Sequence, residues 1–298
     1  MSAAPLVSIG LPVYNGERFL VQALDSLLGQ TLGDLELVIS DNASTDRTTE
    51  ICLTYAARDS RVRYIRQQSN IGLTRNWNFV ALQARGRYFK WASANDYCDL
   101  QILEKCVDVL SADPSVVLCH GRTCIVIEET DEHTSFPYDI SATDPRASAR
   151  FQSVVRTIVL NNALSGVIRL DNLRRTPLIP LYLHGDVALT AELALQGRIV
   201  LLPQILFYRR MGPATSSMQM KPADLRAFFD PGSAGPARFE RWRRHMDYFR
   251  AALRTPMSMR EKLRTLMLAA HHAGRDVVAG ARKLAQRSVG IVRKQANA

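Results

Sequence analysis

The sequence predicts an α/β protein: a Rossmann-like, mostly parallel sheet flanked by helices, with a helical C-terminal extension. Two observations support this. Through residues 6–127, short apolar runs alternate with amphipathic segments of about ten or more residues, which is typical of βαβ units. After a stretch rich in Pro, Gly and Ser, the last part of the chain is basic and carries apolar residues at helical spacing.

The first half predicts strands and helices in strict alternation. Asn15 is expected to cap the first helix and Ser44 or Thr45 the second, with Asp46 near the positive end of the second. The expected strands are 6–12, 35–40, 62–67, 87–93 and 115–122, and the expected helices are 16–30, 44–57, 73–85 and 100–110.

The second half is less regular. Its polar start predicts a long loop or insertion over 128–150, and Gly197 is expected to end a helix that begins near residue 186. The predicted organisation is a main domain 1–211 with halves of about 1–127 and 128–211, a linker 212–236, and a basic helical extension 237–298.

The charge is distributed unevenly along the chain. Residues 209–298 carry 19 Lys and Arg against 6 Asp and Glu, whereas residues 1–208 carry 19 against 22. The basic third therefore favours an anionic partner, either a membrane surface or a polyanion. No nucleic-acid-binding module is recognisable, so nucleic acid is not the expected partner.

The cellular compartment is predicted from targeting segments, long apolar runs and cysteine spacing. Neither a signal peptide nor an apolar run of about 18 residues is present. Five cysteines without C-x-x-C spacing disfavour a disulfide framework or a structural zinc site. We therefore expect a cytoplasmic protein with reduced thiols, with peripheral attachment to the inner face of the cell membrane as an extension of that prediction.

Polar residues follow several of the predicted strands. Parallel sheets bind ligands beyond the carboxyl ends of their strands, so these residues are candidate site residues. Asp41 has two interpretations: it accepts a hydrogen bond from a nucleobase, or it helps its neighbours to cap the next helix. The pair Asn95–Asp96 indicates a metal site, a weakened metal site or a polar turn.

Three segments in this order resemble one known family. They are "VSIGLPVYNGERFLVQALDSLLGQT", "LELVISDNASTDRT" and "NIGLTRNWNFVALQARGRYFKWASANDY". Together they resemble the inverting family 2 glycosyltransferases of the GT-A fold, in particular a bacterial subgroup with "fkWaahDD" where this chain has "FKWASAND". The resemblance covers about residues 6–127 and, less closely, 150–220. The Gly-rich strand–helix turn of dinucleotide-binding sites is not found at these positions.

The resemblance implies a donor site for a nucleotide-sugar, most often a UDP-sugar. Asp41 would accept the imide N–H of the base, and Asn78 would help to shape the pocket. The nucleoside would lie against the turn formed by Pro12, Val13, Tyr14 and Asn15.

The resemblance also implies a divalent metal, Mg²⁺ or Mn²⁺, held by Asp96. Such an ion would neutralise the departing diphosphate. Asn95 stands where the family usually has a second acid, so it would be an uncharged ligand. Asp99 would compensate for that lost charge or cap the following helix.

The catalytic base implied by the resemblance is Asp186, which would take the proton of the acceptor hydroxyl in a single inverting displacement. From the residues alone, Asp186 is equally a helix N-cap. Arg209 or Arg210, at the end of the last strand, would contact the diphosphate; of the two, we select Arg210. His184 would contact the acceptor or a phosphate, or be a surface residue.

The function implied is transfer of a sugar to a hydroxyl of a glycan or lipid-linked glycan acceptor. A non-catalytic nucleotide- or glycan-binding homologue is the first alternative, because Asn95 replaces an acid. A sugar nucleotidyltransferase is the second, but "PVYNGERF" lacks the Gly-rich basic phosphate loop that this chemistry favours. The basic tail would pack on the catalytic domain or contact an anionic membrane.

Overall fold

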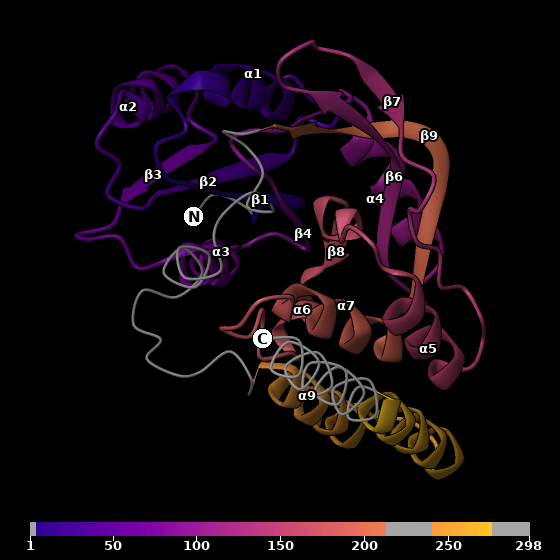
Figure 1. The fold of residues 1–298 in the computed structure, drawn as a ribbon. Coiled ribbons are helices and arrows are strands. Elements are labelled where there is room, and N and C mark those ends of the chain that lie inside the picture. The colour runs from indigo at the N-terminus through magenta and orange to yellow at the C-terminus, as the bar shows by residue number, and fades with distance from the viewer. Residues whose placement is uncertain (1–3, 213–239, 276–298) are drawn as a thin grey trace, which may run out of the picture.

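The computed structural model describes residues 4–212 and 240–275 (Figure 1). Almost all of the expected linker 212–236 and the final segment 276–298 lie outside the described residues. One nine-stranded sheet runs through the described part in the order β3-β2-β1-β4-β8-β6-β9-β5, and β7 pairs with β6.

The N-terminal half of the sheet is parallel, as predicted. Strand β1 (Val7–Val13) pairs with β2 (Leu35–Asp41) on one side and β4 (Tyr88–Trp91) on the other, and β3 (Val62–Arg66) pairs with β2. Strands β2 and β3 are added on one side of β1, and the chain then places β4 on the other side of β1. The strand order therefore reverses between β1 and β4. A crevice forms at such a reversal, beyond the carboxyl ends of the two strands.

Beyond β4 the sheet is mixed, which the prediction of a mostly parallel sheet did not anticipate. Strand β8 is antiparallel to both β4 and β6, while β6 and β9 run parallel to each other along most of their lengths. The remaining strands are β5 (Tyr97–Cys98), β6 (Val116–Ile127), β7 (His133–Ser135), β8 (Val167–Arg169) and β9 (Arg198–Met211). The segment 198–210 is therefore one long strand, and the expected loop 128–150 contains β7.

Helices cover both faces of the sheet (Figure 1). Residues of α1 (Glu17–Leu28), α2 (Thr48–Arg58) and α4 (Ile102–Ala112) enter one apolar cluster. Residues of α3 (Leu73–Leu82), α5 (Ala147–Thr157), α6 (Leu170–Arg174) and α7 (Gly185–Gln196) enter the other, on the opposite face. The short 3₁₀ helix η1 (Asn162–Ser165) precedes β8.

Two predicted helix caps are wrong, and the reason is the same for both. Helix α1 begins after Gly16 rather than Asn15, and α2 begins at Thr48, later than a cap at Ser44 or Thr45 requires. Asp46 accepts hydrogen bonds from the backbone N–H of Glu17 (3.1 Å) and of Thr48 (3.0 Å). A single carboxylate thus serves the N-termini of two adjacent helices, a contact that spacing along one helix does not reveal.

The C-terminal helix pair, defined as α9 (Glu240–Arg254) and the helix 259–275, forms an outer layer on α5 and α7 (Figure 1). Tyr248 meets Phe151 of α5 edge to face at a centroid distance of 5.3 Å. Glu261 accepts hydrogen bonds from the backbone and the hydroxyl of Ser148. Among the described residues, no helix is long and apolar enough to cross a membrane.

Candidate active site

Two turns meet at the reversal between β1 and β4. A Cβ on Gly16 would lie 3.1 Å from the Cβ of Ala94, so the β1–α1 turn and the turn after β4 are packed against each other there. Asn15 has a left-handed backbone (φ 48°), and its side-chain oxygen accepts the backbone N–H of Thr45 at 2.8 Å. Asn15 therefore joins the β1–α1 turn to the β2–α2 loop, while the neighbouring Tyr14 side chain is exposed.

Asp41, the last residue of β2, is completely buried. Its Oδ2 accepts hydrogen bonds from the hydroxyls of Thr49 (2.7 Å) and Tyr64 (2.8 Å) and forms an ion pair with Arg66 at 2.9 Å. Its Oδ1 accepts the backbone N–H of Ser44 at 2.8 Å. Burial alone raises the pKa of the Asp41 carboxyl, but these donors outweigh burial and hold its pKa below the ordinary value.

Asp96 lies in the turn after β4 and has far fewer protein partners. Its Oδ1 accepts the backbone N–H of Arg210 at 2.9 Å, and the Ser93 side chain is a second hydrogen-bond partner. Burial raises the pKa of the Asp96 carboxyl, and the nearby charges of Arg209 and Lys90, together with these hydrogen bonds, oppose that shift only in part. The negative charge of this carboxylate is therefore compensated only in part by the protein.

Arg210 is buried and has a structural role in this turn. Its guanidinium donates to the backbone carbonyl of Asn95 at 3.2 Å and to the side chain of Gln22, and lies 4.2 Å from the ring centre of Phe19. These contacts fix the position of the Asn95–Asp96 turn between α1 and β9. The guanidinium therefore supports the turn, and the predicted contact of Arg210 with a diphosphate stays a prediction.

Arg209, the neighbouring residue, is half-buried and sends its guanidinium to Asn162 of η1 at 2.7 Å. Its charge is close enough to oppose the upward shift of the Asp96 pKa. Of the two arginines at the end of β9, Arg209 is thus the one with an electrostatic link to the Asp96 carboxylate itself.

Lys90, in the middle of β4, is a buried cation beneath the turn. Only 1% of its surface is exposed, and its Nζ donates to the backbone carbonyl of Ser165. Burial lowers the pKa of Lys90, and the negative charge of Asp96 is among the groups that oppose this shift. Sequence reasoning missed Lys90 because it stands inside an apolar strand pattern; that placement of a charged residue was itself the signal.

Asp186 lies in the first turn of α7, directly after Gly185, and is half-buried. Its backbone carbonyl accepts the hydroxyl of Thr190, and Thr190 also exchanges hydrogen bonds with the side chain of Asn161. Asn161 is followed directly by Asn162, the partner of Arg209. A chain of contacts therefore runs from the start of α7 through η1 to the end of β9.

Three other candidates occupy distinct places. The side-chain amide of Asn78 donates to the carbonyl and accepts the N–H of Ile179, so it holds the 178–180 segment against α3. Asp99 accepts the backbone N–H of Gln101, just before α4. His184, exposed and left-handed at φ 66°, immediately precedes α7. Their roles towards a ligand remain predictions.

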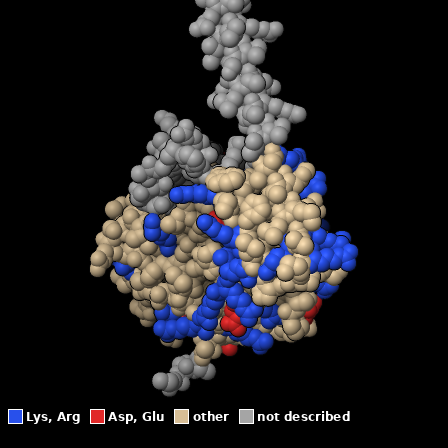
Figure 2. Space-filling model, turned by 90° about the horizontal axis from the view of Figure 1, so that it is seen from below, with Lys and Arg blue, Asp and Glu red and all other residues tan. Residues whose placement is uncertain are grey.

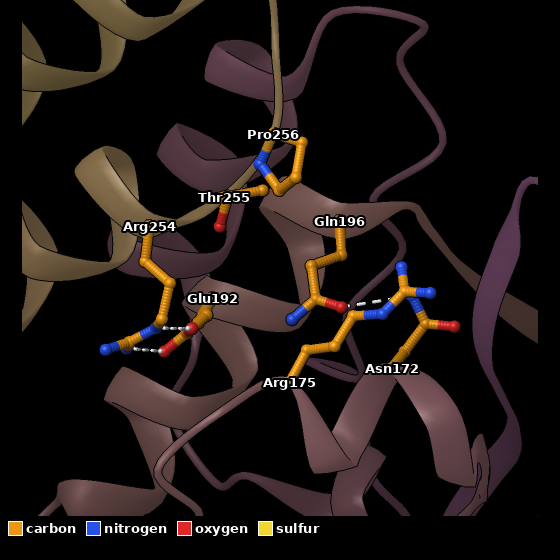
Figure 3. Close-up of a pocket in the computed structure, with 7 residues that line it drawn as sticks. All are labelled: Asn172, Arg175, Glu192, Gln196, Arg254, Thr255 and Pro256. Atoms are coloured by element: carbon orange, nitrogen blue, oxygen red, sulfur yellow. Dashed lines mark hydrogen bonds and ion pairs between the residues drawn. The ribbon is translucent and has the colours of Figure 1, made fainter.

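A cavity of about 380 Å³ lies elsewhere, where α6 and α7 meet the end of α9 (Figure 3). On one side of the cavity Glu192 and Arg254 form a two-pronged ion pair, with both N–O distances at 2.8 Å, and Asn172 donates to Gln196. The ion pair fastens α9 to α7, and the amide contact joins α6 to α7. None of the site residues expected from the sequence lines this cavity.

A divalent metal fits this site only in part. Among the described residues, no three His, Cys, Asp or Glu side chains come together as a ready-made metal cluster. Asp96 is the one carboxylate at this turn, and Asn95 adds an uncharged amide. A Mg²⁺ or Mn²⁺ ion there would need ligands from the donor's phosphates and from water.

This arrangement is that of an α/β protein with polar residues gathered at the strand-order reversal, which is where sheets of this kind bind ligands. Residues 8–163 match the family model described as Glycosyl transferase family 2, and the chain belongs to this family.

Curated relatives match this chain in sequence over parts of their lengths. An uncharacterized glycosyltransferase EpsJ of Bacillus subtilis is 41% identical over 101 residues, which cover 34% of this chain and 29% of that protein. A chondroitin synthase of Escherichia coli is 35% identical over 116 residues, covering 39% of this chain and 17% of the synthase. The chain thus matches less than a third of the length of either relative.

The fold is that of a solved bacterial structure. Residues 1–349 of Staphylococcus aureus TarS superpose with a TM-score of 0.61 at 17% identity, over 87% of this chain and 69% of that one, in a complex with UDP. A second complex of the same protein, with UDP-GlcNAc, gives a TM-score of 0.60 at 18% identity. The GT-A-type fold expected from the sequence is therefore confirmed.

Proposed function

We propose that the protein transfers a sugar, with inversion, from a UDP-sugar to a hydroxyl of a bacterial glycan or lipid-linked glycan on the cytoplasmic side of the membrane. The observation that carries this is that the carboxyl ends of β1, β2 and β4 lie side by side, with the turn that contains the partly exposed Asp96 packed against the β1–α1 turn. Family membership supports the reaction class. The name of the chondroitin synthase supports a glycan acceptor, and the TarS complexes support uracil as the base.

The nucleoside half of the donor would lie over Pro12, Val13, Tyr14 and Asn15, where the exposed Tyr14 ring offers a flat surface. Asp41 would accept the imide N–H of uracil. Its oxygens already have four protein donors, so binding requires Arg66, whose side chain is partly exposed, to move aside.

The diphosphate half of the donor would lie near Asn95, Asp96 and Arg209. A bound Mg²⁺ or Mn²⁺ would supply Lewis-acid charge to the departing diphosphate. Asp96 would hold that ion. Arg209 and Lys90 add positive charge of the protein itself around the same turn, while Arg210 keeps the turn in place.

Asp186 would take the proton of the attacking acceptor hydroxyl. A carboxylate is basic enough for this task, because that proton becomes acidic as the hydroxyl attacks the anomeric carbon. This role is supported by the position of Asp186 at the start of α7, a helix whose Thr190 is linked through Asn161 and the adjacent Asn162 to Arg209.

The test is the variant Asp186→Asn, assayed for sugar transfer and, by calorimetry, for UDP binding. Transfer should fall by a factor of about 10²–10⁴ while the affinity for UDP stays within about twofold of the wild type. Asp171→Asn, a change at an exposed carboxylate on the neighbouring α6, is the matched control and should leave both quantities unchanged. An active Asp186→Asn enzyme would remove the base assignment.

A non-catalytic binding homologue is the second candidate, supported by Asn95 in place of an acid. A thermal-shift screen of nucleotide-sugars with Mg²⁺ or Mn²⁺, followed by product analysis, separates the two candidates. A nucleotide-sugar that binds the native state raises its apparent stability for either candidate, so only product analysis separates them. Stabilisation without turnover against any glycan acceptor would favour the binding protein.

A further inference from the structure

The outer face of the C-terminal helix pair carries exposed apolar side chains. Trp242 and Leu253 of α9 are 11 residues apart, close to three turns, so they share one side of that helix. Met259, Leu263 and Met267 recur at intervals of four on the next helix. All five side chains are between 52% and 70% exposed.

The exposed side chains do not take part in packing the helix pair against the rest of the protein. The opposite sides of the two helices are already packed, because Tyr248, Ala252 and Ala269 are buried. The Glu192–Arg254 ion pair and the Glu261–Ser148 hydrogen bonds fasten the same sides to α7 and α5. Large apolar side chains left exposed together on one part of a protein are typical of an interaction site.

The charge beside this stripe is positive. Arg243, Arg250 and Arg260 are exposed on the two helices, and residues 240–275 contain nine Lys and Arg against three Asp and Glu. Figure 2 shows that Lys and Arg cover much more than Asp and Glu on the face of the molecule to which the pair belongs. The final 23 residues, outside the described part, add five more basic residues against one acid.

We propose that this outer face, the stripe Trp242, Leu253, Met259, Leu263 and Met267 with its flanking arginines, docks on an anionic lipid surface. Apolar side chains would enter the boundary between headgroups and acyl chains while the guanidinium groups contact lipid phosphates. A second copy of the chain is disfavoured as occupant, because it would bring two faces of the same positive charge together.

The membrane contact expected from the sequence rested on the basic charge of the C-terminal extension as a whole, whereas this proposal names the residues of one exposed apolar face. It is also independent of glycosyl transfer, because lipid binding needs neither donor nor acceptor. If the catalytic assignment fails, the lipid-docking proposal is unaffected. If lipid docking fails, the catalytic assignment is unaffected.

The experiment is flotation of the full-length protein with vesicles of phosphatidylcholine alone and of an equal mixture with phosphatidylglycerol. The wild type should float with the mixed vesicles only. Leu263→Ser/Met267→Ser should weaken the apparent partition constant by at least about tenfold. Arg243→Gln/Arg260→Gln should weaken it by roughly tenfold or more and make it less sensitive to salt.

Leu53→Ser/Leu82→Ser is the matched control, because it removes two similarly exposed leucines from α2 and α3, away from the helix pair. It should bind like the wild type, and circular dichroism should show all variants folded. Equal binding by the Leu263/Met267 variant, or equal flotation with phosphatidylcholine alone, would overturn the proposal. A lipid-independent dimer abolished by the same variant, without vesicle binding, would assign the face to a second copy instead.

Discussion

The two carboxylates at the candidate site, Asp41 and Asp96, have opposite environments. Asp41 is fully buried, receives four donors and has a pKa below its ordinary value. Asp96 has two hydrogen-bond partners, the backbone N–H of Arg210 and the side chain of Ser93, and burial raises its pKa. The protein thus stabilises the charge of Asp41 and leaves the charge of Asp96 under-compensated.

The difference is between a buried charge that the protein itself compensates and one that it compensates only in part. A satisfied buried carboxylate adds to stability, whereas one that is desolvated with few partners lowers it unless something else supplies positive charge. Functional sites commonly contain the second kind. The contrast gives four predictions, in order of expected size.

The largest effect is expected from Asp41→Asn. It removes the charge that pairs with Arg66 and leaves the donors of Thr49, Tyr64 and Ser44 competing for one acceptor. The free energy of unfolding should fall by about 3 kcal/mol, as measured by urea denaturation. Asp34→Asn, at an exposed carboxylate just before β2, should change it by less than about 0.5 kcal/mol. Equal stability of the two variants would contradict the contrast.

Asp96→Asn should mainly affect ligand binding. UDP affinity in the presence of Mn²⁺ should drop by roughly tenfold, because the charged metal ligand is gone, while affinity measured with chelator should barely change. Calorimetry with and without Mn²⁺ measures both. If Mn²⁺ still tightens UDP binding to this variant, the metal is held elsewhere.

The pH dependence of stability should differ in sign between the two sites. Because folding lowers the pKa of Asp41, its contribution is present above the unfolded value of 3.8 and disappears as the pH falls through the folded value. Folding raises the pKa of Asp96, so its ionisation costs stability as the pH rises above 3.8. The Tm of Asp96→Asn should therefore exceed that of the wild type at neutral pH and approach it in acid. A wild type more stable at neutral pH would contradict this.

The smallest effect is expected from Asn95→Asp. A second carboxylate beside Asp96 should tighten Mn²⁺-dependent UDP binding by about threefold to tenfold, because it adds a charged ligand where an amide now stands. Gln101→Glu, at an exposed residue just before α4, controls for added negative charge in general. A gain that Gln101→Glu reproduces would show a general electrostatic effect instead of metal coordination.

The sequence by itself determined the alternation of strands and helices, and hence which residues stand at strand ends. Hydrophobic periodicity is a local property, and the βαβ rules convert it into a parallel sheet with β4 beside β1. The placement of Asp41 and Asp96 at the carboxyl ends of β2 and β4 followed from that. The motif resemblance also identified the family correctly.

Only the tertiary structure decided what surrounds those residues. Arg210 and Arg209 are neighbours in β9, yet one fixes the Asn95–Asp96 turn and the other reaches Asn162. Asp46 serves two helices, and Lys90 lies buried beside Ser165 of a distant segment. Desolvation and hydrogen-bond partners depend on residues far apart in the chain, so the opposite states of the two carboxylates could not be derived from their local sequences.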